Sequence, residues 1–415
     1  MIIKNEMSRT IYRISFQHLK ILKMITMIEL NKDEEKILEK VDKACNEIRK
    51  SEEETYLKGI FNKERIRIFQ KYDLLGIPIE KKYGGLGASL LTYVLALERI
   101  GQEGSTLRTF FSVHVSIGQL TLQQFGNEEQ KKKYLRKTTK GKMMMGFALT
   151  EPEAGSDPTS MTTSFIENGN HFILNGKKKW IGHATIGDLF TTYAKDKKGV
   201  ISAFLVENDS AGFSSKRQEP TLGLRNHDVG EINFKNCKIP KSNLLGERGK
   251  GLHIAYDTLL NGRLSVAAGS VGVMQDCLKE SVDYSRKRIM HKKPIGKHQL
   301  IQRHIAKIST NLEAARWLTI HAALAKLAYI ENNTKETRAY ADAMITKAKY
   351  FTTNVSFDAA DRAVQIHGGN GYDLKSRVAR HFLDERVTRI YEGTNEILEQ
   401  KIAVDVLGKE FEAYG

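Results

Sequence analysis

The chain has 415 residues, which at roughly 150 residues per domain is enough for two or three domains. Its composition, 40% hydrophobic and 27% charged, is that of an ordinary globular protein. No apolar run approaches the ~20 residues that cross a bilayer, so we expect no membrane span. The net charge of +16 suits either a polyanionic ligand or a lysine-rich solvated surface. Basic runs are scattered without interleaved aromatic residues, which disfavours nucleic acid.

Residues 1–26 are rich in Lys and Arg and contain a single acid, Glu6. They resemble an organellar transit segment, or they reflect a start codon assigned too far upstream, and we favour the second interpretation. The cytoplasm is then the expected location, with the mitochondrial matrix as the alternative. The three cysteines, Cys45, Cys237 and Cys277, are far apart and lack metal-site spacing, so we expect neither a disulfide nor a metal.

Residues 27–145 are predicted to be helical. Leu30, Ile37, Val41 and Ile48 recur at helical spacing, and residues 90–100 and 112–124 form two further apolar stretches. Residues 146–248 lose that period. Short β-rich pieces at 171–174, 189–193 and 201–206, separated by turn residues, predict a small antiparallel barrel or sandwich.

Residues 249–415 return to long helices. We expect them at 252–286, 299–330 and 335–366, with a shorter pair at 374–387 and 394–407, which together form a bundle. The predicted fold class is therefore α+β, with a β domain between two helical ones. Such a layered interface offers a crevice for a large cofactor.

Two stretches in the β segment carry candidate binding groups. Residues 147–157 lead from a strand into a turn with hydroxyls and backbone N–H groups, which can hold a flat polar ring or a phosphate, or can be a plain surface turn. Trp180, in Lys179-Trp180-Ile181, is either a core residue or a stacking wall for an aromatic group.

Two stretches in the last segment carry further candidates. The glycines of residues 365–371 either admit a pyrophosphate or cap a helix. Glu392 lies between Tyr391 and Gly393, and Thr394 can cap the following helix. Burial would raise the pKa of Glu392 and suit a general base, whereas an exposed Glu would only interact with the helix dipole.

In this order, these four stretches resemble the acyl-CoA dehydrogenase family over residues 30–410, and the glutaryl-CoA dehydrogenase group in particular. The most specific pieces are Leu149-Thr150-Glu151-Pro152 with Gly155-Ser156-Asp157, and residues 365–371 with Tyr391-Glu392-Gly393-Thr394. The resemblance implies a helical domain, a β domain and a four-helix bundle, with FAD, a homotetramer and an electron-transfer flavoprotein as acceptor. It also implies a role in fatty acid or amino acid catabolism.

The resemblance further implies site roles. Glu392 matches the base that removes the proton at Cα, while the hydride at Cβ goes to flavin N5. The implied cofactor contacts are Phe147, Leu149, Thr150, Ser156, Trp180, Ile181, Gly182, Arg288, Gln299, Gln365, Gly368, Gly369 and Thr394, with Arg288 reaching the FAD of a neighbouring subunit. The implied substrate contacts are Arg108, Ser112, Ser156, Arg263, Tyr391 and Gly393. No metal is implied.

Some positions depart from the family pattern. Gly182 stands where a threonine usually follows Trp-Ile, so an oxygen-using oxidase stays open beside the dehydrogenase. His291-Lys292 replaces the usual Phe-Gly, and Lys375 replaces a common acid. Arg108 resembles the residue that holds the distal carboxylate of glutaryl-CoA, which is decarboxylated to crotonyl-CoA; otherwise a short acyl-CoA is expected. A catalytically silent flavoprotein is the third alternative, which retention of Glu392 disfavours.

Overall fold

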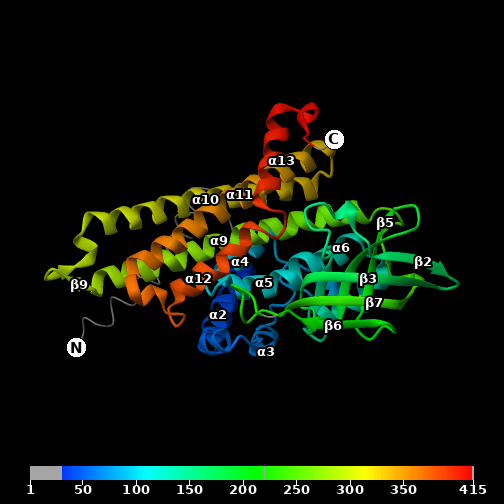
Figure 1. Ribbon diagram of the computed structural model, residues 1–415, viewed down its shortest axis with the longest axis horizontal. Coiled ribbons are helices and arrows are strands. Elements are labelled where there is room, and N and C mark those ends of the chain that lie inside the picture. The colour runs from blue at the N-terminus through cyan, green and yellow to red at the C-terminus, as the bar shows by residue number, and fades with distance from the viewer. Residues whose placement is uncertain (1–29, 219, 414–415) are drawn as a thin grey trace.

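The computed structural model describes residues 30–218 and 220–413, so the expectation for residues 1–26 lies outside the described part. A helical segment, a sheet and a long helical bundle follow one another along the chain, which confirms the predicted fold class. Figure 1 shows the sheet at one end of the long axis and the hairpin strand β9 (Ile289–Met290) at the other.

The N-terminal helices begin with α2 (Lys32–Lys58), which starts at a capping box formed by Asn31 and Glu34 and ends at Gly59 with φ 66°. The others, up to the sheet, are α3 (Glu64–Lys71), η1 (Lys81–Tyr83), α4 (Leu90–Gly101), α5 (Ser105–His114), α6 (Leu120–Phe125), α7 (Glu128–Gln130) and α8 (Arg136–Thr138).

The apolar stretch at 112–124 is not one regular helix. A π-helical turn, η2 (Val115–Gln119), separates α5 from α6, and a second one, η3 (Lys131–Leu135), separates α7 from α8. A π turn inserts one residue into a helix, and a hydrophobic period does not reveal the turn at 115–119, because all five of its residues are buried, polar ones included.

The β segment forms an eight-stranded sheet in the order β6-β7-β3-β2-β4-β5-β8, with β1 beside β4. Most pairs are antiparallel as expected, but β1 and β2 each pair with β4 in parallel, so the sheet is mixed. The strands are β1 (Met145–Ala148), β2 (Ser164–Asn168), β3 (His171–Gly182), β4 (Leu189–Lys195), β5 (Ile201–Glu207), β6 (Phe213–Arg217), β7 (Val229–Pro240) and β8 (Leu244–Leu245).

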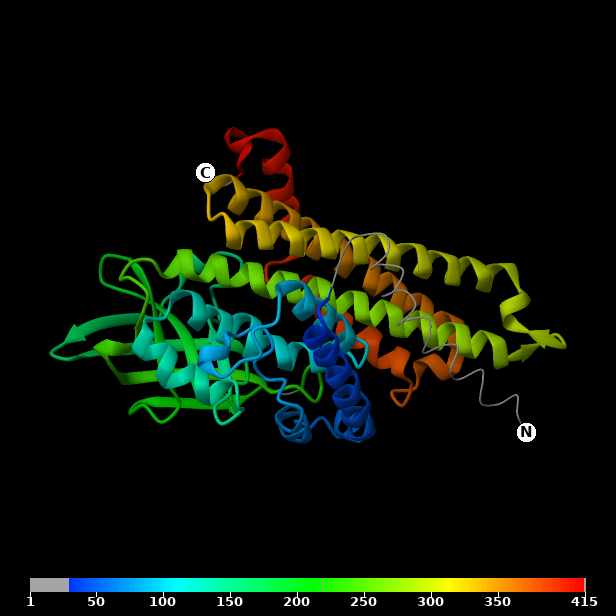
Figure 2. The ribbon, with the colours of Figure 1, turned by 180° about the vertical axis from the view of Figure 1, so that it is seen from behind.

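The C-terminal bundle consists of α9 (Gly251–Lys287), α10 (Gln299–Glu331) and α11 (Lys335–His367), which run side by side, as Figures 1 and 2 both show. The remaining helices are α12 (Arg377–Glu385) and α13 (Asn395–Leu407), with short 3₁₀ turns at η4 (Pro158–Ser160), η5 (Lys241–Asn243), η6 (Ile295–Lys297), η7 (Gly368–Tyr372), η8 (Arg386–Arg389) and η9 (Lys409–Phe411).

The hairpin between α9 and α10 consists of β9 and β10 (Lys293–Pro294), which turn through His291 and Lys292, both with positive φ. Within the described residues, no helix has both the length and the apolarity to cross a bilayer. Cys45, Cys237 and Cys277 are buried free thiols, which confirms the absence of a disulfide among them.

Candidate active site

Residues 390–394, here called the base loop, connect η8 to α13 and carry the candidate base. Glu392 has φ 57° and Gly393 has φ 90°, so two consecutive residues adopt the left-handed conformation. That conformation is costly for a side chain other than glycine, Asn or Asp. The Thr394 hydroxyl then caps α13 by accepting a hydrogen bond of 3.3 Å from the Ile397 N–H, as the sequence predicts.

The carboxyl group of Glu392 packs against the backbone of α9. A Cβ added to Gly262 would lie 2.2 Å from Glu392 Oε2, so only glycine admits the carboxyl group there. Oε2 is enclosed and has no hydrogen-bond partner. Burial raises the pKa of Glu392 to about 7, against the opposite pull of Arg263, Arg108 and Lys349. The structure thus encloses the Glu392 carboxyl group instead of leaving it exposed to solvent, and its role as a base stays a prediction.

Arg263 binds the main chain of the base loop. Its Nε donates a hydrogen bond of 2.9 Å to the Glu392 carbonyl, and its guanidinium lies 3.5 Å from Asp342. Burial lowers the pKa of Arg263, with Asp342 and Glu392 opposing.

Arg108, on α5, is buried and packs so closely on α9 that a Cβ at Gly269 would lie 2.4 Å from its Cγ. Its guanidinium donates to the Tyr391 hydroxyl and lies 5.3 Å from the centre of the Tyr391 ring. Its Nε has no partner, and no carboxylate forms an ion pair with it in the described residues. Ser112 is buried one helical turn further along α5. A buried guanidinium without an anion is a candidate anion site.

The turn after β1 is tied to β3 by a buried ion pair. Lys178 Nζ lies 2.8 Å from Glu151 Oε1 and donates to the Leu149 carbonyl at 3.0 Å, while the Lys179 N–H donates to the Thr150 carbonyl. Phe147 contacts Tyr193 edge to face, and Ser156 is exposed. Sequence reasoning identified this turn but missed the ion pair that holds it.

Trp180 exposes 54% of its surface and has φ 60°, while its neighbour Ile181 is buried. An uncovered indole at the end of a strand can be covered by a flat aromatic ring, so this position fits a flavin. The departure at Gly182 has a packing cause, since a Cβ there would lie 2.9 Å from Val113 Cγ2 and 3.3 Å from His227 Nε2.

Sequence reasoning missed two buried residues beside these groups. His227 is buried with neither ring nitrogen hydrogen-bonded, and burial keeps its pKa well below the usual value. Lys349, on α11, donates to the Gly393 carbonyl at 2.8 Å and to Asn395 Oδ1 at 2.9 Å. Neither residue carries a local sequence signal, because each acts through residues distant in the chain.

The remaining predicted cofactor residues lie elsewhere. Arg288 directly precedes β9 and Gln299 begins α10, and Figure 1 places β9 at the opposite end of the molecule from the sheet that carries Trp180. Gln365, Gly368 and Gly369 are exposed at the end of α11, with open space around both glycines. One chain therefore brings together Glu392, Arg263, Arg108, Tyr391 and Gly393, but not Arg288 and Gln299.

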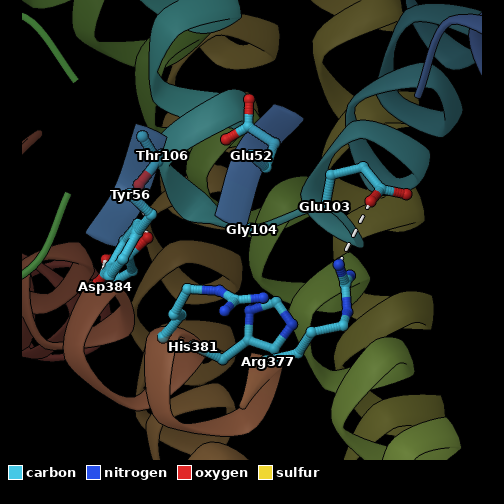
Figure 3. Close-up of a pocket in the computed structure, with 9 residues that line it drawn as sticks. Glu52, Tyr56, Glu103, Gly104, Thr106, Arg377, His381 and Asp384 are labelled. Carbon is cyan, nitrogen blue, oxygen red and sulfur yellow. Dashed lines mark hydrogen bonds and ion pairs between the residues drawn. The ribbon is translucent and has the colours of Figure 1, made fainter. Parts of the chain in front are cut away.

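A separate cavity of about 20 Å³, drawn in Figure 3, lies among polar and charged residues of α2, α12 and the start of α5 with the connection before it. Glu103 contacts Arg377, and Asp384 accepts hydrogen bonds from Tyr56 and Thr106. A space of this size holds about one water molecule. The cavity is thus a paired polar junction between helices, too small for an acyl substrate.

Comparison with known proteins covers nearly the whole described chain. The N-terminal, middle and C-terminal domains of acyl-CoA dehydrogenase match residues 31–142, 146–237 and 249–407. The chain is 37% identical over 355 residues to the caffeyl-CoA reductase-Etf complex subunit CarC of Acetobacterium woodii, covering 85% of this chain and 91% of that protein.

Two solved structures share the fold. The butyryl-CoA dehydrogenase of Megasphaera elsdenii has a TM-score of 0.86 and 32% identity, and the match covers 92% of this chain and all of that one. A glutaryl-CoA dehydrogenase of Mycobacterium smegmatis, in complex with FADH2, has a TM-score of 0.86 and 26% identity, covering 94% of this chain and 98% of that one.

Proposed function

The chain belongs to the acyl-CoA dehydrogenase family of FAD-dependent oxidoreductases, and on that premise we propose that it forms the α,β double bond of a short-chain acyl-CoA thioester, with Glu392 as the base. The observation that carries this proposal is the enclosed carboxyl group of Glu392, held against Gly262 with its pKa raised to about 7 by burial. FAD supplies the acceptor for the hydride that leaves Cβ.

The chain's own residues prepare the proton transfer. A carboxyl group with a pKa near the working pH is partly ionised and can still accept a proton without a large energetic penalty. By resemblance, the Glu392 N–H holds the thioester carbonyl, where negative charge develops as the Cα proton leaves. Arg263 fixes the carbonyl of the same residue, so the direction of the Glu392 backbone is set from α9.

The test is anaerobic bleaching of the bound flavin by butyryl-CoA. The Glu392→Gln variant should lose the reaction by at least about a thousandfold, because the neutral amide that replaces the carboxylate against Gly262 cannot accept the proton. Glu399→Gln is the matched control, since Glu399 is an exposed residue of α13 and should leave the rate unchanged. A Glu392→Gln variant that bleaches at the wild-type rate would remove the base assignment.

A substrate with a distal carboxylate, such as glutaryl-CoA, is the second candidate, and Arg108 favours it. The buried guanidinium lacks an anion, and a substrate carboxylate would pair with it and use the free Nε. In that case Arg108→Met should lower kcat/KM for glutaryl-CoA about a hundredfold or more while leaving butyryl-CoA within a few-fold. A wild-type flavin that responds quickly to butyryl-CoA and not to glutaryl-CoA would contradict this second candidate.

We further propose that electrons leave through an electron-transfer flavoprotein, which the similarity to an Etf-complex subunit supports. The oxidase alternative predicts hydrogen peroxide when substrate and air are the only reactants, and a silent flavoprotein predicts no bleaching with any acyl-CoA. A homotetramer and a cytoplasmic location are part of the same proposal. The relatives named above come from bacteria and give the mitochondrial alternative no support.

A further inference from the structure

Two buried cations from two different helices bind consecutive carbonyls of the base loop. Arg263 of α9 binds the Glu392 carbonyl at 2.9 Å, and Lys349 of α11 binds the Gly393 carbonyl at 2.8 Å. Within the base loop, these are the two residues with left-handed φ. For Glu392, which is not a glycine, this backbone conformation is costly and persists only where the surroundings determine it. Hydrogen bonds to the two carbonyls supply such a constraint.

Lys349 loses the hydration of its ammonium group when it is buried next to the Gly393 carbonyl. Its side chain is fully buried, and in the described part of the chain its ammonium has no carboxylate at ion-pair distance, only the Gly393 carbonyl and Asn395 Oδ1. Asn395 is held in turn by Thr353 and Asn354 of the same helix α11. A buried lysine that lacks an ion pair costs stability, so a stabilising role in the bundle does not explain it.

We propose that Lys349 is a positioning residue for the base: it holds the base loop in the conformation that directs the Glu392 carboxyl group onto Gly262. This inference rests on the proposed role of Glu392. Lys349 acts through the Gly393 carbonyl and its charge, and it is not assigned a contact with the substrate.

The charge of Lys349 also acts on the base. Lys349 is one of the cations that pull the pKa of Glu392 down against burial. Burial lowers the pKa of Lys349 to about 7, Arg263 adds to this effect, and Glu392 opposes it. The other charged groups that act on Lys349 are Glu396 of α13 and Arg389 of η8. Removal of the lysine charge should therefore raise the pKa at which Glu392 titrates.

The experiment compares the FAD-loaded wild type with Lys349→Met, Lys349→Arg and Lys326→Met. Lys326 is the matched control, because it is a buried lysine of the same bundle whose pKa burial lowers to about 8, and its ammonium binds Asn261 instead of the base loop. The first measurement is the pH dependence of anaerobic flavin reduction by butyryl-CoA. The second is hydrogen–deuterium exchange of the peptide covering residues 389–398.

Lys349→Met should raise the apparent pKa of the reaction by about one unit, lower the plateau rate about tenfold or more, and speed exchange in the peptide. Lys349→Arg should restore the apparent pKa to within a few tenths of a unit, because the charge is retained. Lys326→Met should lower the unfolding temperature and leave both the apparent pKa and the exchange unchanged.

Wild-type pKa and wild-type exchange in Lys349→Met would overturn the proposal, and so would equal shifts in Lys326→Met. Should Lys349→Met not retain FAD, the Lys349→Gln variant, which keeps an N–H donor without the charge, is measured in its place. Failure of the proposed function is seen separately: Glu392→Gln would then reduce the flavin normally, whereas exchange of the base loop would still respond to Lys349→Met.

Discussion

At the scale of single residues, the charge of Glu392 makes the rate depend on pH near neutrality. Burial raises the pKa of Glu392 to about 7, and only the ionised form accepts a proton, so the rate should increase with pH through that value. At pH 6 flavin reduction should be about tenfold slower than its plateau above pH 8. Stopped-flow bleaching of the flavin between pH 5.5 and 9, with a thioester that does not itself titrate, measures this pH dependence. A rate of flavin reduction that does not change with pH would contradict the prediction.

Gly262 determines whether the base has room. In Gly262→Ala the new methyl would overlap Glu392 Oε2, so the carboxyl group must leave its position even though alanine favours a helix. We expect flavin reduction to fall at least a hundredfold with the helix content and the unfolding temperature maintained. Ser265→Ala is the control, because its buried hydroxyl on the same helix has no hydrogen-bond partner. Normal activity in Gly262→Ala would refute the packing described here.

The sequence indicated Glu392 as a candidate base, whereas it did not indicate the buried residues that lie beside it in the fold. From local chemistry alone, an acid between Tyr391 and Gly393, followed by a capping Thr394, left two interpretations open, a buried base and an exposed Glu at a helix start. Lys349 and His227 have no such local sign, because a lysine in a helix or a histidine in a loop becomes special only through partners far away in the chain.

At the scale of secondary-structure elements, the ion pair between Lys178 and Glu151 connects β3 to the turn after β1. Both side chains are buried, so Lys178→Met would leave an uncompensated carboxylate and should cost about 3 kcal/mol. Calorimetry of the variant should show a lower unfolding temperature, together with faster loss of flavin from the turn. Lys36→Ala, which removes a pair exposed on α2, should change stability by less than about 1 kcal/mol. Equal effects in the two variants would contradict this assignment.

Element positions follow from hydrophobic period and turn residues, and here the sequence predicts them closely. The expected helix at 335–366 is α11 (Lys335–His367), and the expected strand at 201–206 is β5 (Ile201–Glu207). The direction in which strands pair is harder to predict, because the hydrophobic pattern of a buried strand is the same for parallel and antiparallel pairing. The parallel pairing of β1 with β4 and the π turn at Val115–Gln119 were therefore not predictable from pattern.

At the scale of the whole molecule, the predicted cofactor residues of the sheet and those next to β9 belong to parts of the chain at opposite ends of the molecule (Figure 1). Trp180 belongs to β3 (His171–Gly182), whereas Arg288 directly precedes β9, which lies at the opposite end of the long axis from the sheet (Figure 1). The exposed side chains at that end, Ile289, Met290 and Leu300, leave an apolar surface next to Arg288. This separation supports the expectation, drawn from the family resemblance, that Arg288 reaches the FAD of a neighbouring subunit in the proposed homotetramer.

A cofactor site shared between subunits, as the proposed homotetramer requires, would make inactivating substitutions complement one another. Arg288→Ala and Glu392→Gln should each inactivate the pure assembly, but co-expressed copies form hybrids in which an intact Glu392 meets the intact Arg288 of its neighbour. When the two chains pair at random, about a quarter of the sites should be active. The amplitude of flavin reduction should then be about a quarter of the wild-type amplitude. Mixing Glu392→Gln with Gly262→Ala should restore no flavin reduction. Glu392 and Gly262 pack against each other within one chain, so no hybrid combines an intact Glu392 with an intact Gly262.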